Sequence, residues 1–134
     1  MVRREVTIKE RRMPEREEME DLMEWVCECL GLVKGRDTDK TSAKLLTCFL
    51  RHSLKNEPTT PEIMAAELNL SRSTVLHHLK KYMKSGLIIR TSKGYELRER
   101  TLEDTIREIE KDVEREFERI RRIARKIDEA LRKL

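Results

Sequence analysis

The last 34 residues, 101–134, most constrain the fold, because they contain neither glycine nor proline and their apolar residues recur every three or four positions. This spacing predicts one uninterrupted helix with a single apolar seam, close to a coiled-coil heptad and with one insertion between Val113 and Phe117. At about 1.5 Å per residue the helix spans roughly 50 Å, longer than a small domain can cover. We therefore expect it to pair with the same helix of a second copy. The seam residues assigned to this dimer contact are Ile106, Ile109, Val113, Phe117, Ile120, Ile127 and Leu131.

A second amphipathic helix is predicted over residues 14–30, with acidic residues in its first turns and Gly31 after its end. Its apolar stripe is assigned to the dimer contact as well, and contains Met19, Leu22, Met23 and Val26. The stripe and the neighbouring Trp25 could instead line an effector pocket, although a dimer seam is the commoner use of such residues. Residues 1–13 alternate weakly between apolar and charged, so an edge strand and a frayed arm both remain open.

A third helix is expected to begin with Asp39 or Thr41 as its N-cap, after a linker over residues 33–39, and to end before the Asn56–Pro58 segment. Its predicted core residues are Leu45, Leu46, Phe49, Leu50 and Leu54. Cys48 lies in the same apolar stretch and is expected to be a core residue.

The clearest local signals lie between residues 60 and 97. Thr60 can cap a short helix that starts at Pro61 and carries an apolar face from Ile63 to Leu68. After an Asn69–Ser71 turn, a further helix capped by Ser71 runs to Gly86, with Val75, Leu79, Tyr82 and Met83 as its inward stripe. Two short strand-like runs around a Thr-Ser-Lys-Gly turn follow directly. A helix-turn-helix followed by a hairpin is the winged form of the motif.

The charge is distributed unevenly along the chain. The net formal charge of +4 divides into −1 over residues 1–36, +5 over residues 37–100 and 0 over residues 101–134, and no acidic residue lies between Glu67 and Glu96. A 28-residue segment without an acid, in a chain that is 42% charged, indicates a polyanionic partner.

The second helix of the motif, about residues 71–85, is therefore predicted to lie in the DNA major groove, with the wing, about 88–97, on the backbone or the minor groove. Contacts to bases or sugars are assigned to Arg72, Ser73, Thr74 and His77, and contacts to phosphates to Lys80, Lys81, Lys84, Arg90 and Lys93. His78 borders the apolar stripe, so both a DNA contact and a hydrogen bond within the domain are open for it. The alternative for the whole set is a solvated basic face and a turn that merely ends the sheet.

Several other classes are disfavoured. The apolar runs are too short for a transmembrane helix, and the N-terminal residues have no apolar segment typical of a secretory signal, so we expect a cytoplasmic protein without a membrane partner. Three cysteines do not indicate a disulfide framework. Cys27 and Cys29 point about 200° apart on a helix, so they are not expected to bind one metal ion. No histidine has a carboxylate at a useful spacing and no phosphate-binding loop is present, so we predict no enzyme, no cofactor and no metal site.

The stretch from Thr60 to Leu97 resembles the winged helix-turn-helix of ArsR/MarR-type transcriptional regulators, especially small archaeal ones. The resemblance rests on Ser71, Ser73, Thr74, Val75, His78, Leu79, Gly86 and Leu87. It implies a homodimer, joined by the flanking terminal helices, on a pseudo-palindromic DNA site. Metal-sensing members carry a Cys-x-Cys pair in the first helix of the motif, where this chain has Ile63–Leu68, so their metal sensing is not implied. The high content of Glu, Lys and Arg is also typical of a thermophile's surface.

Together these patterns predict a mainly α fold with a small β-hairpin. Residues 1–36 form an N-terminal arm and helix, residues 37–100 the winged DNA-binding domain, and residues 101–134 the dimerisation helix. The predicted function is sequence-specific regulation of transcription by a homodimer on double-stranded DNA, with no effector identified. Two alternatives remain: a winged-helix module that binds proteins, and a chromatin or general transcription factor without sequence preference.

Overall fold

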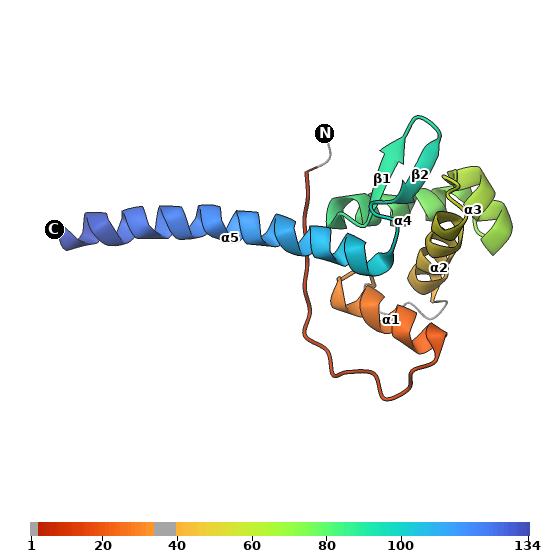
Figure 1. Cartoon of the computed structure of the whole chain (residues 1–134), viewed down its shortest axis with the longest axis horizontal. Helices are drawn as coiled ribbons and strands as arrows, with labels where there is room; N and C mark the ends of the chain where they lie inside the picture. The colour runs from red at the N-terminus through yellow and green to blue at the C-terminus, as the bar shows by residue number, and fades with distance from the viewer. Residues whose placement is uncertain (1–2, 34–39) are drawn as a thin grey trace.

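The computed structural model describes residues 3–33 and 40–134, and it confirms a mainly helical chain with one small antiparallel hairpin. The elements in order are α1 (Met19–Cys29), α2 (Thr41–Leu54), α3 (Pro61–Leu68), α4 (Arg72–Ser85), β1 (Ile88–Thr91), β2 (Gly94–Leu97) and α5 (Leu102–Arg132). Helices α1 to α4 and the hairpin gather into one body, from which α5 projects as a single long rod (Figure 1).

The helix-turn-helix forms where its local signals predict it. Thr60 caps α3, because its Oγ1 accepts a hydrogen bond from the backbone N–H of Ile63 at 3.2 Å. Ser71 caps α4 in the same way, accepting from the backbone N–H of Thr74 at 3.1 Å. Gly86 ends α4 in the left-handed conformation, with φ of 87°. Each bond satisfies a backbone group that a helix end leaves unpaired, so the boundaries are set locally.

The core lies between α2, α4 and the hairpin. Phe49 of α2 meets Tyr82 of α4 edge to face, with ring centroids 6.2 Å apart. The Tyr82 hydroxyl donates a hydrogen bond of 2.7 Å to the backbone carbonyl of Ser42, so this buried ring keeps its polar end satisfied. The other fully buried apolar side chains of this core include Leu45, Leu46, Cys48, Met64, Val75, Leu79 and Leu87.

The hairpin is pinned to the body by one backbone bridge. Ile88 pairs with Leu97 and Thr91 with Gly94, while Thr59 exchanges two backbone hydrogen bonds with Tyr95, at 2.8 and 2.7 Å. Gly94 has φ of 140°, and a Cβ placed there would lie 2.5 Å from the Thr59 carbonyl oxygen. Only glycine fits this position, so the bridge and the glycine together set the direction of the hairpin.

The N-terminal helix begins five residues later than predicted. Residues 3–18 form an extended arm instead, held by backbone hydrogen bonds from Glu5 to Lys84 and from Lys9 to Cys29. Trp25 donates its indole N–H to the carbonyl of Arg12 at 2.6 Å. The arm is thus neither a regular strand nor a frayed end, because contacts with α1 and α4 hold it across the body (Figure 1).

Two expectations for α2 were also wrong. The N-cap is Lys40, which is in the left-handed conformation and makes no side-chain cap bond, and Thr41 is already helical. Asp39 and most of the predicted linker lie outside the described residues. Leu54 is 83% exposed rather than buried, because it is the last residue of α2 and the chain turns away at Asn56. Ile63 of α3 is likewise 43% exposed.

Helix α5 starts at its predicted cap, since the Thr101 hydroxyl accepts from the backbone N–H of Asp104 at 3.0 Å. Its first turns pack on the body through buried Ile109. Asp112 accepts hydrogen bonds from Arg98, at 2.6 and 3.2 Å, and is also paired with Arg4 of the arm. These three side chains clasp the end of the hairpin, the arm and α5 together, and so fix where the rod leaves the body.

Candidate nucleic-acid interface

Helix α4 presents the polar face that the sequence predicts for DNA contact. Val75, Leu79 and Tyr82 point into the core, which leaves the opposite face in solvent. The exposed residues of the predicted set on this helix are Arg72, Ser73, His77, Lys80 and Lys84, whereas Thr74 and Lys81 are half-buried. A 14-residue helix with one apolar and one basic face can lie against a polyanion without disturbing the core.

Two side chains at the start of α4 have partners within the chain. Arg72 donates to Glu62 of α3 at 2.7 Å, and this ion pair is exposed on both sides. The hydrogen bond from Arg72 is the main cause that lowers the pKa of the Glu62 carboxyl. Arg72 would therefore have to exchange Glu62 for a base or a phosphate, an exchange that an exposed pair permits at small cost.

His77 and His78 have different surroundings. His77 is exposed, while His78 is half-buried and its Nδ1 lies 3.3 Å from the Ser42 hydroxyl of α2. The two imidazoles lie edge to face with centroids 5.7 Å apart. Of the two roles open for His78, the hydrogen bond within the domain is the one that this geometry favours.

The turn of the wing is built by Thr91. Its hydroxyl donates to the Gly94 carbonyl at 3.2 Å and accepts from the backbone N–H of Lys93 at 3.2 Å. The Lys93 side chain is exposed at the tip, and the guanidinium of Arg90 lies 5.8 Å from the centre of the Tyr95 ring. The wing, α3 and the start of α4 line a common groove, which contains Glu62, Arg72, Leu76, Arg90 and Lys93.

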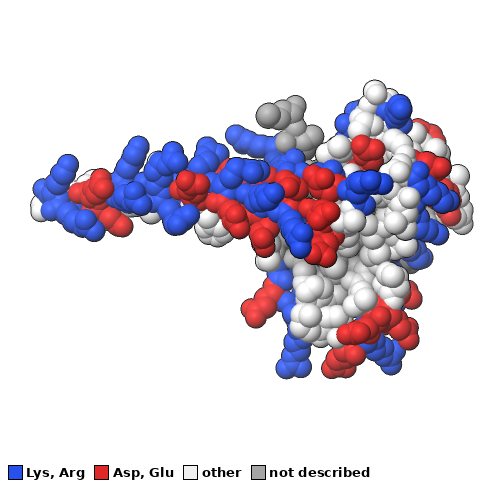
Figure 2. Space-filling view, in the orientation of Figure 1, with Lys and Arg blue, Asp and Glu red and all other residues white. Residues whose placement is uncertain are grey.

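The space-filling view reveals a second basic region (Figure 2). Residues 119–134 of α5 carry seven basic and two acidic side chains, while residues 103–118 carry three basic and eight acidic ones. The zero net charge of residues 101–134 therefore conceals an acidic half near the body and a basic half away from it. A shorter window in the charge count would have found this division in the sequence.

The predicted dimer residues occupy two different environments. Met23 and Ile109 are buried within the chain's own core, and Val26 and Ile106 pack against it. Leu22 and Val113 are half-buried. The side chains that the body leaves exposed are Met19, Phe117, Ile120, Ile127 and Leu131, together with Ile123. Met19 and Met23 also line an open cleft of about 320 Å³ between α1 and α2.

Comparison with known families finds one similarity, in the middle of the chain. Residues 41–102 match a family model, described as the N-terminal domain of the methanogenesis regulatory protein FilR1. The match begins at the first residue of α2 and ends at the first residue of α5, so it covers the helix-turn-helix and the hairpin. No curated protein and no solved structure matches the chain.

The match to the FilR1 N-terminal domain supports a regulatory protein, which is the coarser part of the function that the sequence predicts. It does not confirm the more specific resemblance to ArsR/MarR-type regulators. A regulatory family is also in keeping with a chain that is not an enzyme. Within residues 3–33 and 40–134, no helix is long and apolar enough to cross a membrane.

The three cysteines, all within the described residues, form no disulfide and lie in different settings. Cys27 is buried and Cys29 half-buried on α1. Cys48 is fully buried on α2 and donates a hydrogen bond of 3.3 Å to Glu67 of α3. Burial, reinforced by the hydrogen bond and the charge of Glu67, raises the pKa of the Cys48 thiol to about 12. The hydrogen bond from Cys48 is in turn the main cause that lowers the pKa of Glu67.

One expectation about the histidines was wrong. His52 has two carboxylates beside its ring, since Nε2 lies 3.2 Å from Glu67 and Nδ1 lies 3.9 Å from Glu57. Glu67 is fifteen residues away in the sequence, and the packing of α3 on α2 brings it to His52 and Cys48. Only the interval of four between Cys48 and His52, which places them on one helix face, was visible in the sequence.

Proposed function

We propose that this protein is a homodimeric regulator of transcription that binds double-stranded DNA through α4 and the wing. The observation that carries the proposal is the exposed basic face of α4, at the centre of the 28 residues that lack an acid. It lies beside the wing, so a duplex seated on α4 can also reach Lys93. The match to a regulatory N-terminal domain supports the same function.

Specific contacts are assigned to the N-terminal part of α4. Arg72 and Ser73 stand on the first turn, where such a helix reaches base edges, and arginine can pair with guanine through two hydrogen bonds. Lys80 and Lys84 follow about two and three turns further along the exposed face and are assigned to phosphates. Thr74, His77, Lys81, Arg90 and Lys93 complete the proposed contact set.

The homodimer is assigned to the exposed seam of α5. Phe117, Ile120, Ile127 and Leu131 of α5 are each more than half exposed. Contiguous apolar surface of this kind is typical of an interaction site, and a heptad-like seam fits another helix of the same kind. A two-fold dimer would place two copies of α4 on successive major grooves, about 34 Å apart.

Selection of genomic DNA fragments by the purified protein tests both parts of the proposal. A specific homodimer enriches one motif with two half-sites whose centres are about 10 base pairs apart. Enrichment of no motif, with binding retained, would instead favour a factor without sequence preference. Absence of DNA binding, with capture of an acidic protein, would favour the protein-interaction module.

The variant Lys80→Glu/Lys84→Glu connects the selected DNA to α4. Both side chains are exposed, so the charge reversal leaves the core intact and should abolish the DNA complex. A matched control is Arg107→Glu/Lys111→Glu, which reverses two exposed charges on α5 outside its basic half. Equal loss in both variants would contradict the assignment to α4.

A further inference from the structure

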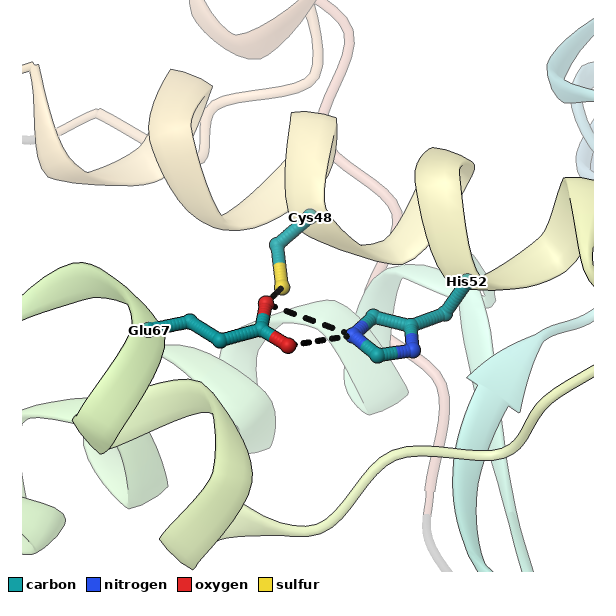
Figure 3. Close-up of side chains that lie close together, drawn as sticks. All are labelled: Cys48, His52 and Glu67. Atoms are coloured by element: carbon teal, nitrogen blue, oxygen red, sulfur yellow. Dashed lines mark hydrogen bonds and ion pairs between the residues drawn. The ribbon is translucent and has the colours of Figure 1, made fainter.

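Three metal-binding side chains meet between α2 and α3 (Figure 3). Cys48 and His52 stand four residues apart on one face of α2, and Glu67 approaches them from α3. The Glu67 carboxylate lies 3.3 Å from the Cys48 sulfur and 3.2 Å from the His52 Nε2. One donor atom from each side chain lies within 4.8 Å of the other two.

The two distances to Glu67 are close to the edges of a tetrahedral metal centre. Zinc binds sulfur at about 2.3 Å, and nitrogen or oxygen at about 2.0–2.1 Å, in tetrahedral geometry. Those bond lengths place a nitrogen and an oxygen ligand about 3.3 Å apart, and a sulfur and an oxygen ligand about 3.6 Å apart. The Oε2 atom of Glu67 lies 3.3 Å from both the Cys48 sulfur and the His52 Nε2, so these two edges require only small shifts of the side chains. The sulfur and the nitrogen lie within 4.8 Å of each other and would move closer together on binding.

The second nitrogen of His52 provides an independent indication. Nδ1 is buried and makes no hydrogen bond to any residue that the structure describes, but Glu57 lies 3.9 Å from it. A histidine that binds a metal through one nitrogen usually donates the other N–H to a carboxylate, which orients the ring. Glu57 stands where this carboxylate would be needed, so Nε2 is left to face Cys48 and Glu67.

We propose that Cys48, His52 and Glu67 form a zinc site that joins α2 to α3. A thiolate together with an imidazole selects zinc over magnesium or calcium, and three protein ligands leave a fourth position for water. On binding, the Cys48 sulfur bonds to the metal and its proton passes to solvent. The site is separate from the Cys27–Cys29 pair on α1 and does not depend on DNA binding.

The location has a structural consequence. Helix α3 is the first helix of the helix-turn-helix, and α2 is part of the core on which it rests. Glu67 is the penultimate residue of α3 and its side chain is 43% exposed. Without a metal, two hydrogen bonds join it to α2, one with the buried Cys48 and one with His52. Zinc would replace these bonds by a fixed link between the two helices.

Zinc binding to the purified full-length chain tests the proposal, with zinc chloride competing against a chromophoric chelator. We expect one zinc ion per chain. Loss of an outer carboxylate partner typically weakens a zinc site about 10- to 100-fold, so loss of a ligand itself should weaken this one at least about 100-fold. That loss is expected for Cys48→Ser, His52→Gln and Glu67→Gln, and not for Cys29→Ser, which removes a thiol outside the cluster.

Glu67→Gln is the decisive variant, because Glu67 is exposed and its replacement leaves the buried core unchanged. Cobalt provides a second readout, since a thiolate-to-cobalt charge-transfer band should appear in the wild type and in Cys29→Ser, and be absent from Cys48→Ser. Failure to bind zinc would overturn the proposal. So would zinc binding that survives Glu67→Gln unchanged, or a thiolate band that survives Cys48→Ser.

Discussion

The clasp around Asp112 should contribute more to stability than any other ion pair on α5. Its side chain is 11% exposed and that of Arg98 is 14% exposed, and two hydrogen bonds join them. Removing one partner of a buried pair typically costs about 3–5 kcal/mol, because the other charge stays buried without compensation. Since Arg98 retains contact with Glu108 at 4.0 Å, we expect Asp112→Ala to cost about 3 kcal/mol, at the lower end of that range.

The matched control is Glu103→Ala, which breaks an exposed pair with Arg107 on the same helix. Both of those side chains are more than half exposed, so the expected loss is about 0.3–0.5 kcal/mol. Urea unfolding at pH 7 and at one protein concentration measures both variants. A loss below about 1 kcal/mol for Asp112→Ala, or a loss equal to that of the control, would refute the reasoning.

The same clasp predicts a dependence on pH. Burial raises the pKa of Asp112, but the hydrogen bonds and charges of Arg98 and Arg4 outweigh it and hold the pKa below its usual value. A carboxyl with a lowered folded-state pKa stabilises the fold above its unfolded pKa of about 3.9, and this stabilisation is lost as the pH falls towards the folded value. In urea unfolding, Asp112→Asn should therefore lack the part of the fall in stability that the wild type shows between about pH 4 and the lower, folded pKa of Asp112.

Three further perturbations test other parts of the structure. Gly94→Ala should destabilise the fold by about 1–3 kcal/mol, since its Cβ would lie 2.5 Å from the Thr59 carbonyl oxygen. The control Lys93→Ala should cost under about 0.5 kcal/mol. Equal effects of the two variants in thermal unfolding would contradict the close approach of Thr59 to Gly94. If α5 forms the proposed dimer, Ile120→Asn/Ile127→Asn should yield a folded monomer in sedimentation. In a parallel pairing the two basic halves of α5 would meet, so the wild-type dimer should tighten with added salt; a dimer that salt weakens would instead require ion pairs between the helices. A thiol reagent at neutral pH should modify Cys29 first and Cys48 only on unfolding, since Cys48 is buried and the pKa of its thiol is about 12. Equal rates of modification of the two thiols would be inconsistent with the burial of Cys48.

The sequence predicts best those features that are fixed by neighbouring residues. Thr60, Ser71 and Thr101 each cap the helix that follows, and Gly86 ends α4, because a cap satisfies backbone groups within three or four residues. The hairpin and the buried stripe of α4 follow from equally local patterns. These signals were sufficient to predict the order of the elements and the exposed face of α4.

Features that depend on distant contacts were missed. The arm replaces the first turns predicted for α1, which begins only at Met19, and hydrogen bonds from Glu5 to Lys84 and from Lys9 to Cys29 hold the arm on the body. The cluster of Cys48, His52 and Glu67 needs α3 to pack on α2, and no local spacing reveals that contact. Met23 and Ile109 are buried because the chain's own core covers them. A periodic apolar pattern shows that a helix face is covered, but it does not show whether the same chain or a second copy covers it.

The central claim, that the basic face of α4 binds DNA, is tested most directly by the salt dependence of affinity. If three of the five side chains assigned to phosphates, Lys80 and Lys84 among them, make that contact in each subunit of the proposed dimer, log K against log salt concentration should have a slope of about −5. Lys80→Ala/Lys84→Ala removes two contacts per subunit and should reduce the slope to about −2, while Lys111→Ala on α5 should leave it unchanged. A wild-type slope near zero, or a slope that the α4 variant does not alter, would contradict the account.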